Sequence, residues 1–243
     1  MPTSPTPFPN TRWTLLQKLR GGSDADAQMA LETLCRAYWT PLYAVARHGR
    51  MTEHDAQDAV QGFFVTLLRR DTFARADATQ GKLRSLLLKS FNNYCVNEWR
   101  NDQRQKRGEG AEHVPLHDIG GTEDRLSKDL HAPGLSAETL YAREWARAVI
   151  DRSLESLRQS YAAKGQEDRF ALLHGPLMQD DDAGRLDALA ASAGMAASAL
   201  RTALHRMRMQ FRDRIERELA ATLDTNDPAI IQQEVGELFR AFD

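Results

Sequence analysis

The chain has 243 residues, of which 42% are hydrophobic and 27% charged, a balance typical of a folded globular protein and not of a disordered one. Its length fits two domains of about 100 residues better than one small core. The sequence contains no apolar stretch long enough to span a bilayer and does not start with a basic region followed by a hydrophobic one. It therefore predicts a cytoplasmic protein that does not engage a membrane.

Two segments precede the first strongly patterned helix. Residues 1–10 are rich in proline, serine and threonine and predict a flexible N-terminal arm. A short helix is expected from residue 10 or 11 up to the glycine pair at 21–22. Over residues 27–47 the apolar positions then recur at helical spacing, and Pro41 predicts a kink or a break in that helix.

A capping motif opens the next predicted helix. Thr52 stands three residues before Asp55, which is the spacing of a capping box with aspartate in place of the usual glutamate. The helix over 55–70 has an apolar face formed by Ala56, Val60, Phe63, Phe64, Leu67 and Leu68. Residues 71–81 predict a loop.

The segment 82–104 predicts one long helix that is both basic and aromatic. Between residues 82 and 107 there are seven lysines and arginines and only two acidic residues. Cations that neutralise phosphates and aromatic rings that stack on unpaired bases suit a nucleic-acid contact, although core packing competes for the same rings. We expect Phe91 and Cys95 to belong mainly to the core. The candidate DNA contacts are Lys89, Asn92, Asn93, Asn97, Trp99 and Arg100.

Glycine and proline breaks follow this helix and mark a domain boundary. Residues 108–136 lack apolar periodicity and predict a flexible linker between a first domain, 11–107, and a second domain, 137–220. No alternating strand pattern with hairpin turns is present in the sequence. The predicted fold class is therefore all-α, with two helical domains joined by a flexible linker.

Within the second domain, helical periodicity covers 137–161 and 169–178, and a pair of short helices is expected around Gly194. The remaining residues, 221–243, form a separate C-terminal segment. In it, 228–242 predict an acidic amphipathic helix.

The stretch RLDALAASAGMAASALRTALHRMRMQFRDR has the pattern of a helix-turn-helix, which the second domain would contain. Ala190 allows two helices to cross closely, and Gly194, four residues later, accepts the positive φ of the turn. The helix after the turn would enter a major groove, where Arg201 could donate two hydrogen bonds to guanine. The alternative is an alanine-rich helical hairpin with an exposed arginine face. The candidate DNA contacts are Ser198, Arg201, Thr202, His205, Arg206 and Arg208.

The order of these elements resembles a bacterial RNA polymerase sigma factor of the extracytoplasmic-function class. The resemblance rests on LCRAYWTPLYAVAR, DAQDAVQGFF, LRSLLLKSFNNYCVNEWR and the terminal helix-turn-helix, and it covers roughly residues 11–107 and 137–217. It implies that the helix starting at Asp55 binds the clamp helices of the largest polymerase subunit. It also implies that the next helix reads the minus-ten promoter element and the helix-turn-helix reads the minus-thirty-five element.

Mapped by motif, the residues expected to meet basic groups on the polymerase clamp are Asp55, Asp58 and Gln61; the alternative is helix capping and a solvated face. Gln57 stands where the family frequently has glutamate, which reduces the acidity of this surface. Thr52, at the cap of the same helix, is therefore a candidate phosphorylation site, because a phosphate there would restore negative charge beside the helix amides. A serine/threonine protein kinase is accordingly a candidate partner, and the alternative is that Thr52 only caps the helix.

The recognition helix also departs from the family pattern. It carries Ala-Leu-Arg-Thr-Ala over 199–203, where the family often has Thr-Val-Lys-Ser-Arg. The competing interpretation is a stand-alone helix-turn-helix regulator, which needs DNA but no polymerase. An enzyme is not expected, because the histidines are scattered and no HExxH, CxxC or glycine-rich phosphate loop is present. We predict no catalytic residue, no metal and no cofactor, and the cysteines, Cys35 and Cys95, are expected to be buried thiols.

Overall fold

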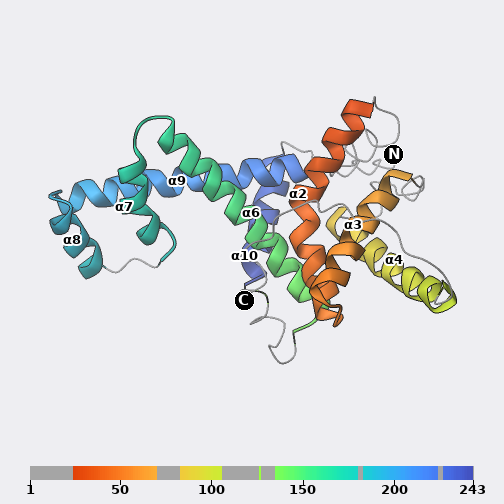
Figure 1. The fold of residues 1–243 in the computed structure, drawn as a ribbon. Coiled ribbons are helices and arrows are strands. Elements are labelled where there is room, and N and C mark those ends of the chain that lie inside the picture. The colour runs from red at the N-terminus through yellow and green to blue at the C-terminus, as the bar shows by residue number, and fades with distance from the viewer. Residues whose placement is uncertain are drawn as a thin grey trace, which may run out of the picture. The chain divides into compact units, whose positions relative to one another are not determined.

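The structure is a computed structural model that describes residues 24–69, 83–105, 126, 135–179, 183–223 and 227–242. All regular structure in these residues is helical, which confirms the predicted all-α class (Figure 1). The helices are α2 (Asp24–His48), α3 (Glu53–Arg69), α4 (Leu83–Gln105), α6 (Ala137–Ala162), α7 (Glu167–Leu177), α8 (Ala183–Ser192), α9 (Ala197–Leu223) and α10 (Pro228–Arg240). The predicted N-terminal arm, the first short helix and the loop over 71–81 lie outside the described residues. Of the predicted linker, Leu126 and residues 135–136 are described.

The chain divides into two compact units. The first unit comprises Met1–Ala148 together with Ala221–Asp243, and the second comprises Val149–Ala220. The second unit ends where the sequence places the end of the second domain, but it begins at residue 149 and not at 137. The predicted C-terminal segment, 221–243, belongs to the first unit and does not stand apart from it.

Helices α2, α3 and α4 pack on one another in the first unit and build an aromatic core. Phe63 is buried at its centre, with its ring centroid 5.3 Å from that of Phe91 and 5.8 Å from that of Tyr94. Phe64 stacks on Trp39 with the two ring planes 7° apart. The predicted apolar face of α3 is thus buried at the five positions for which burial is described: Ala56, Val60, Phe63, Phe64 and Leu67.

Helix α2 continues past Pro41, so the proline does not break the helix. Residues on both sides of it are buried in the same core, including Tyr38 before it and Tyr43 after it. Packing of this continuous apolar face compensates for the backbone hydrogen bond that proline cannot donate. The two cysteines are partly buried free thiols, and burial raises the pKa of Cys35 to about 12 and that of Cys95 to about 11. Both thiols are therefore poor nucleophiles at neutral pH.

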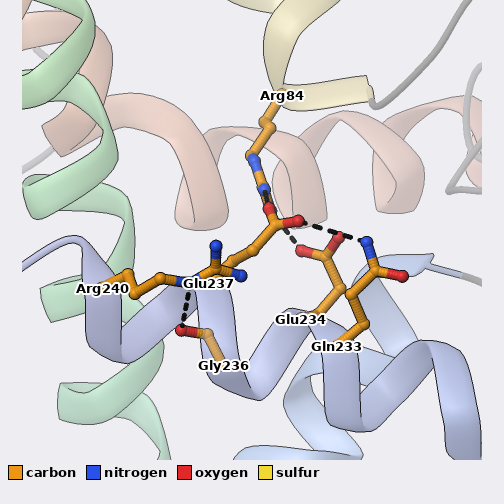
Figure 2. Close-up of polar contacts among 6 residues, drawn as sticks. All are labelled: Arg84, Gln233, Glu234, Gly236, Glu237 and Arg240. Carbon is orange, nitrogen blue, oxygen red and sulfur yellow. Dashed lines mark hydrogen bonds and ion pairs between the residues drawn. The ribbon is translucent and has the colours of Figure 1, made fainter.

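Within the first unit, an arginine of α4 binds helix α10. The guanidinium of Arg84 donates through one terminal nitrogen to Glu234 and through the other to Glu237, both on α10 (Figure 2). The same guanidinium lies 4.4 Å from the centroid of the Trp145 ring on α6. The side chain of Glu234 is only 3% exposed and that of Arg84 17%. The sequence predicted the helix but not this contact, which spans about 150 positions of the chain.

The first turns of α6 also contact α4 and the C-terminal end of α10, which explains why the second unit starts after residue 148. The hydroxyl of Tyr141 donates to the backbone oxygen of Arg84 at 3.1 Å, and Nε of Arg143 donates to the backbone oxygen of Ala241 at 3.1 Å. Val235 and Leu238 add apolar burial on α10. Residues from α4, α6 and α10 therefore form one packed assembly within the first unit.

The second unit is built around a core shared by α6, α7, α8 and α9. Its buried members are Leu157, Tyr161, Leu173, Leu186, Ala190, Leu200, Ala203, Leu204 and Met207. The expectation of two short helices around Gly194 is correct for α8 but wrong for α9, which has 27 residues. Alternating apolar and charged residues with good helix propensity continue after residue 206 without a glycine or proline, so nothing in the sequence ends the helix there.

Candidate nucleic-acid interface

The connection between α8 and α9 is a tight turn centred on Gly194. This glycine has φ +64°, and its N–H donates to the backbone oxygen of Ala191 at 3.1 Å. The next N–H, from Met195, donates to the backbone oxygen of Ala190 at 2.9 Å. These two bonds are those of a Schellman motif with glycine at the left-handed position. The predicted role of Gly194 is therefore confirmed at the level of the backbone.

A buried layer holds α8 and α9 together on either side of this turn. Ala190 is fully buried on α8, and Leu200 and Leu204 are buried on α9. Because α9 starts three residues after Gly194 and its fourth residue is in the core, the direction of its first turns is fixed by packing.

The polar face of α9, defined here as Ser198, Arg201, Thr202, His205 and Arg206, is exposed along its length. Position 198, positions 201 and 202, and positions 205 and 206 follow one another at intervals of three or four residues, so the five side chains share one side of the helix. Residues 197–208 contain three arginines and no acidic residue. A positively charged surface thus starts immediately after the turn.

Two of these side chains have partners within the molecule. A terminal nitrogen of Arg201 donates to the carboxylate of Asp187 on α8, and both side chains are about half exposed. The hydroxyl of Thr202 donates to the backbone oxygen of Ser198 at 2.9 Å, which leaves its oxygen lone pairs available as acceptors.

Arg208, also predicted to lie near DNA, has a different environment. It is half-buried, and its guanidinium donates to the backbone oxygen of Pro176 at 3.2 Å. A cation at this position satisfies a carbonyl at the end of α7 and interacts favourably with the helix dipole. The structure therefore gives Arg208 a role in packing α9 against α7.

A surface groove of about 640 Å³ lies between α7 and the first turns of α9. Its lining includes the apolar side chains Leu172 and Met195 and two arginines, Arg169 from α7 and Arg206 from α9. Neither arginine is paired with a carboxylate of the described residues. Arg169 was not singled out from the sequence, because α7 carries no motif and only its packing beside α9 brings this cation to the same surface.

On α4, the candidate DNA contacts lie on the side of the helix away from the core. Lys89, Asn92, Asn93 and Asn97 are exposed, as is Arg100, whereas Phe91 is fully buried as predicted. Cys95 is only partly buried. The side chain of Trp99 lies outside the described part of the structure. The exposed residues form a polar surface on a helix whose opposite side packs on Phe63.

The start of α3 has the predicted cap. The backbone N–H of Asp55 donates to the Thr52 hydroxyl oxygen at 3.2 Å, and that hydroxyl donates to the Asp55 carboxylate at 2.7 Å. Asp58 pairs with His54 at 2.9 Å and is partly exposed, as is Gln61. Thr52 and Asp55 are exposed. Thr52, Asp55 and Asp58 thus lie beside or within the first two turns of α3, and Gln61 lies near the middle of the helix.

Among the residues that the structure describes, no group of three or more histidine, cysteine, aspartate or glutamate side chains could hold a metal ion. No helix in the described ranges is both long and apolar enough to cross a bilayer. Comparisons with protein-family models, with curated proteins and with solved structures found no match to this chain.

Proposed function

We propose that the protein is an RNA polymerase sigma factor that binds core polymerase through the start of α3 and promoter DNA through α4 and α9. The observation that carries the proposal is the polar face of α9, which follows a glycine turn on a fixed core. The two exposed arginines of this face, Arg201 and Arg206, and the hydroxyl of Ser198 suit the major groove, where base edges present acceptors. In this proposal α8, the turn and α9 form a DNA-binding helix-turn-helix.

The remaining parts of the proposal follow from the resemblance to sigma factors and from the exposure of the candidate side chains on α3 and α4. The exposed residues of α4 would contact the minus-ten element, and Asp55, Asp58 and Gln61 would contact the polymerase clamp. All three of these α3 residues lie in the first half of the helix and are at least partly exposed, so a partner's basic groups could reach them. A stand-alone regulator would need α9 but would give these α3 residues no role in binding polymerase.

The test is run-off transcription with purified core polymerase on a library of promoter fragments, together with co-purification of the polymerase. A sigma factor is expected to co-purify with core polymerase and to start transcripts at defined positions. DNA binding without polymerase binding would favour a stand-alone regulator and reject the proposal. Binding to neither would reject both.

Replacing Asp55 and Asp58 by asparagine is expected to weaken binding to core polymerase about thirtyfold or more, because each loses a charge that would meet a partner cation. Asparagine retains a side-chain oxygen, so the Thr52 cap and the contact with His54 keep an acceptor. Affinity measured by biolayer interferometry checks the result. Glu138→Gln, an exposed acidic position at the start of α6, is the matched control. Equal affinities for the two variants would remove these carboxylates from the interface.

Phosphorylation of Thr52 is expected to raise polymerase affinity by adding about 1.5 to 2 negative charges at the start of α3. The hydroxyl that now donates to Asp55 would be replaced by a phosphate that repels that carboxylate, so the first turn must rearrange. Affinity for core polymerase is compared between kinase-treated wild type and equally treated Thr52→Ala. If Thr52 only caps the helix, phosphorylation does not raise the affinity for polymerase, and Thr52→Ala only lowers the thermal unfolding midpoint.

A further inference from the structure

The carboxylate of Asp187 contacts the guanidinium of Arg201 across the turn between α8 and α9. Because residues 197–208 have no acidic residue of their own, a carboxylate reaches this part of α9 from another helix. We infer that Asp187 is a positioning residue that holds Arg201 ready for base readout and opposes its contact with phosphates. This inference rests on the proposed DNA-binding function of α9.

The position of Asp187 relative to Arg201 is set by the core and not by the ion pair. Leu186, the residue before Asp187, is buried, and Ala190, one turn later, is fully buried. Leu200, the residue before Arg201, is also fully buried. Each charged residue therefore directly follows a core residue, so the two helices present the carboxylate and the guanidinium to each other in a defined register.

Pairing restricts the long arginine side chain before it meets DNA. An unpaired arginine has many rotamers, and ordering it on binding costs conformational entropy. The contact with Asp187 uses one terminal nitrogen, whereas the planar guanidinium carries five N–H donors. The remaining donors keep the fork geometry that matches the two acceptors of a guanine edge. Pre-ordering of the Arg201 side chain thus favours a directed hydrogen bond to a base edge over a non-directional attraction to phosphates.

The same carboxylate reduces attraction to the DNA backbone. Phosphates attract cations in any sequence, and this attraction dominates non-specific binding. A negative charge beside Arg201 cancels part of that attraction for every sequence, whereas a directed contact with a base edge is gained only at the preferred site. Specificity here is the difference between two affinities, and Asp187 lowers the affinity for the wrong DNA.

The experiment uses the full-length chain. Preferred duplexes are selected from a random pool with wild type, and the dissociation constants for the preferred and a scrambled duplex are then measured at several salt concentrations. The variants are Asp187→Ala, Asp187→Asn and Arg201→Ala. The matched control is Asp213→Ala, since Asp213 pairs with Arg217 at 2.9 Å on a later turn of α9.

Asp187→Ala is expected to bind the scrambled duplex about threefold to tenfold more tightly and to show a lower ratio of preferred to scrambled affinity. Its salt dependence steepens by about one phosphate contact. Asp187→Asn keeps an acceptor oxygen for Arg201 but loses the negative charge. It is expected to keep the wild-type base preference and to bind the scrambled duplex more tightly than wild type does. Arg201→Ala loses roughly 5- to 150-fold of discrimination at one base pair. In the Arg201→Ala background, Asp187→Ala changes the discrimination no further.

Because Asp187 is about half exposed, these variants are expected to keep the wild-type circular dichroism spectrum. If Asp187→Ala shifts both duplexes equally, as Asp213→Ala is expected to do, the positioning role is overturned while DNA binding stands. If wild type enriches no DNA sequence, the proposed function fails and the inference fails with it.

Discussion

Arg84→Ala is expected to lower the free energy of unfolding of the first unit by about 3 to 5 kcal/mol. The substitution removes a guanidinium that serves two glutamates of α10 and leaves Glu234, whose side chain is 3% exposed, without that cation. A buried charge that loses its partner destabilises a protein far more than an exposed pair does, because the desolvation of the charge is no longer offset. The loss of the stacking contact with Trp145 adds to the effect.

Urea unfolding followed by tryptophan fluorescence measures this change in the correct unit. The four tryptophans are residues 13, 39, 99 and 145, and all fall within the range of the first unit. Arg36→Ala is the control, because Arg36 and Glu32 form a pair that is 65% exposed at both ends and is expected to contribute well under 1 kcal/mol. The double variant Arg84→Met/Glu234→Leu should recover much of the loss. If Arg84→Ala lowers the free energy of unfolding by less than about 1 kcal/mol, the contacts of Arg84 with Glu234 and Glu237 do not hold α10 in place.

Phe63→Ala is expected to destabilise the first unit by about 3 to 5 kcal/mol. Phe63 is 2% exposed and its ring contacts those of Phe91 and Tyr94 on α4, so the substitution opens a cavity between α3 and α4. The edge-to-face contact with Phe91 and the tilted contact with Tyr94 are lost together with the buried area. This loss is a large part of the total stability of a typical domain, about 5 to 15 kcal/mol.

Two signals separate the units in this experiment. Tryptophan fluorescence reports the first unit, and far-ultraviolet circular dichroism reports helix in both. The fluorescence midpoint should fall in Phe63→Ala while a second transition remains in the circular dichroism curve. Val65→Ala, on the same helix but 38% exposed, should leave both curves close to wild type. Coincident shifts of both signals would show that the units unfold as one.

The features that could be predicted from the sequence are those formed by residues close together in it. The Thr52 cap depends on a spacing of three residues, and the Gly194 turn depends on a single backbone angle. The burial of Phe63 and Phe91 followed from helical periodicity. In each case the determining interaction lies within one or two turns of helix, so local rules apply.

The features that were missed join residues from different helices. Periodicity indicates which side of α10 is buried but not that Arg84 lies beneath it, about 150 residues earlier in the chain. Likewise nothing in the sequence places Asp187 beside Arg201 or Arg169 on the groove of α9, because those contacts depend on how helices pack. Arg208 shows the same limit, since its carbonyl partner is on α7.

The attachment of α10 to Arg84 has a consequence for synthesis on the ribosome. The residues of α4 and the part of α6 up to Ala148 emerge well before residues 228–240, with the whole of the second unit translated in between. At about 5 to 20 residues per second, roughly 4 to 17 s pass between completion of residue 148 and that of Glu234. During this interval Arg84 has no α10 glutamates to bind. The nascent first unit therefore matures only after the second unit has been made, and a polypeptide released early lacks the helix that completes it.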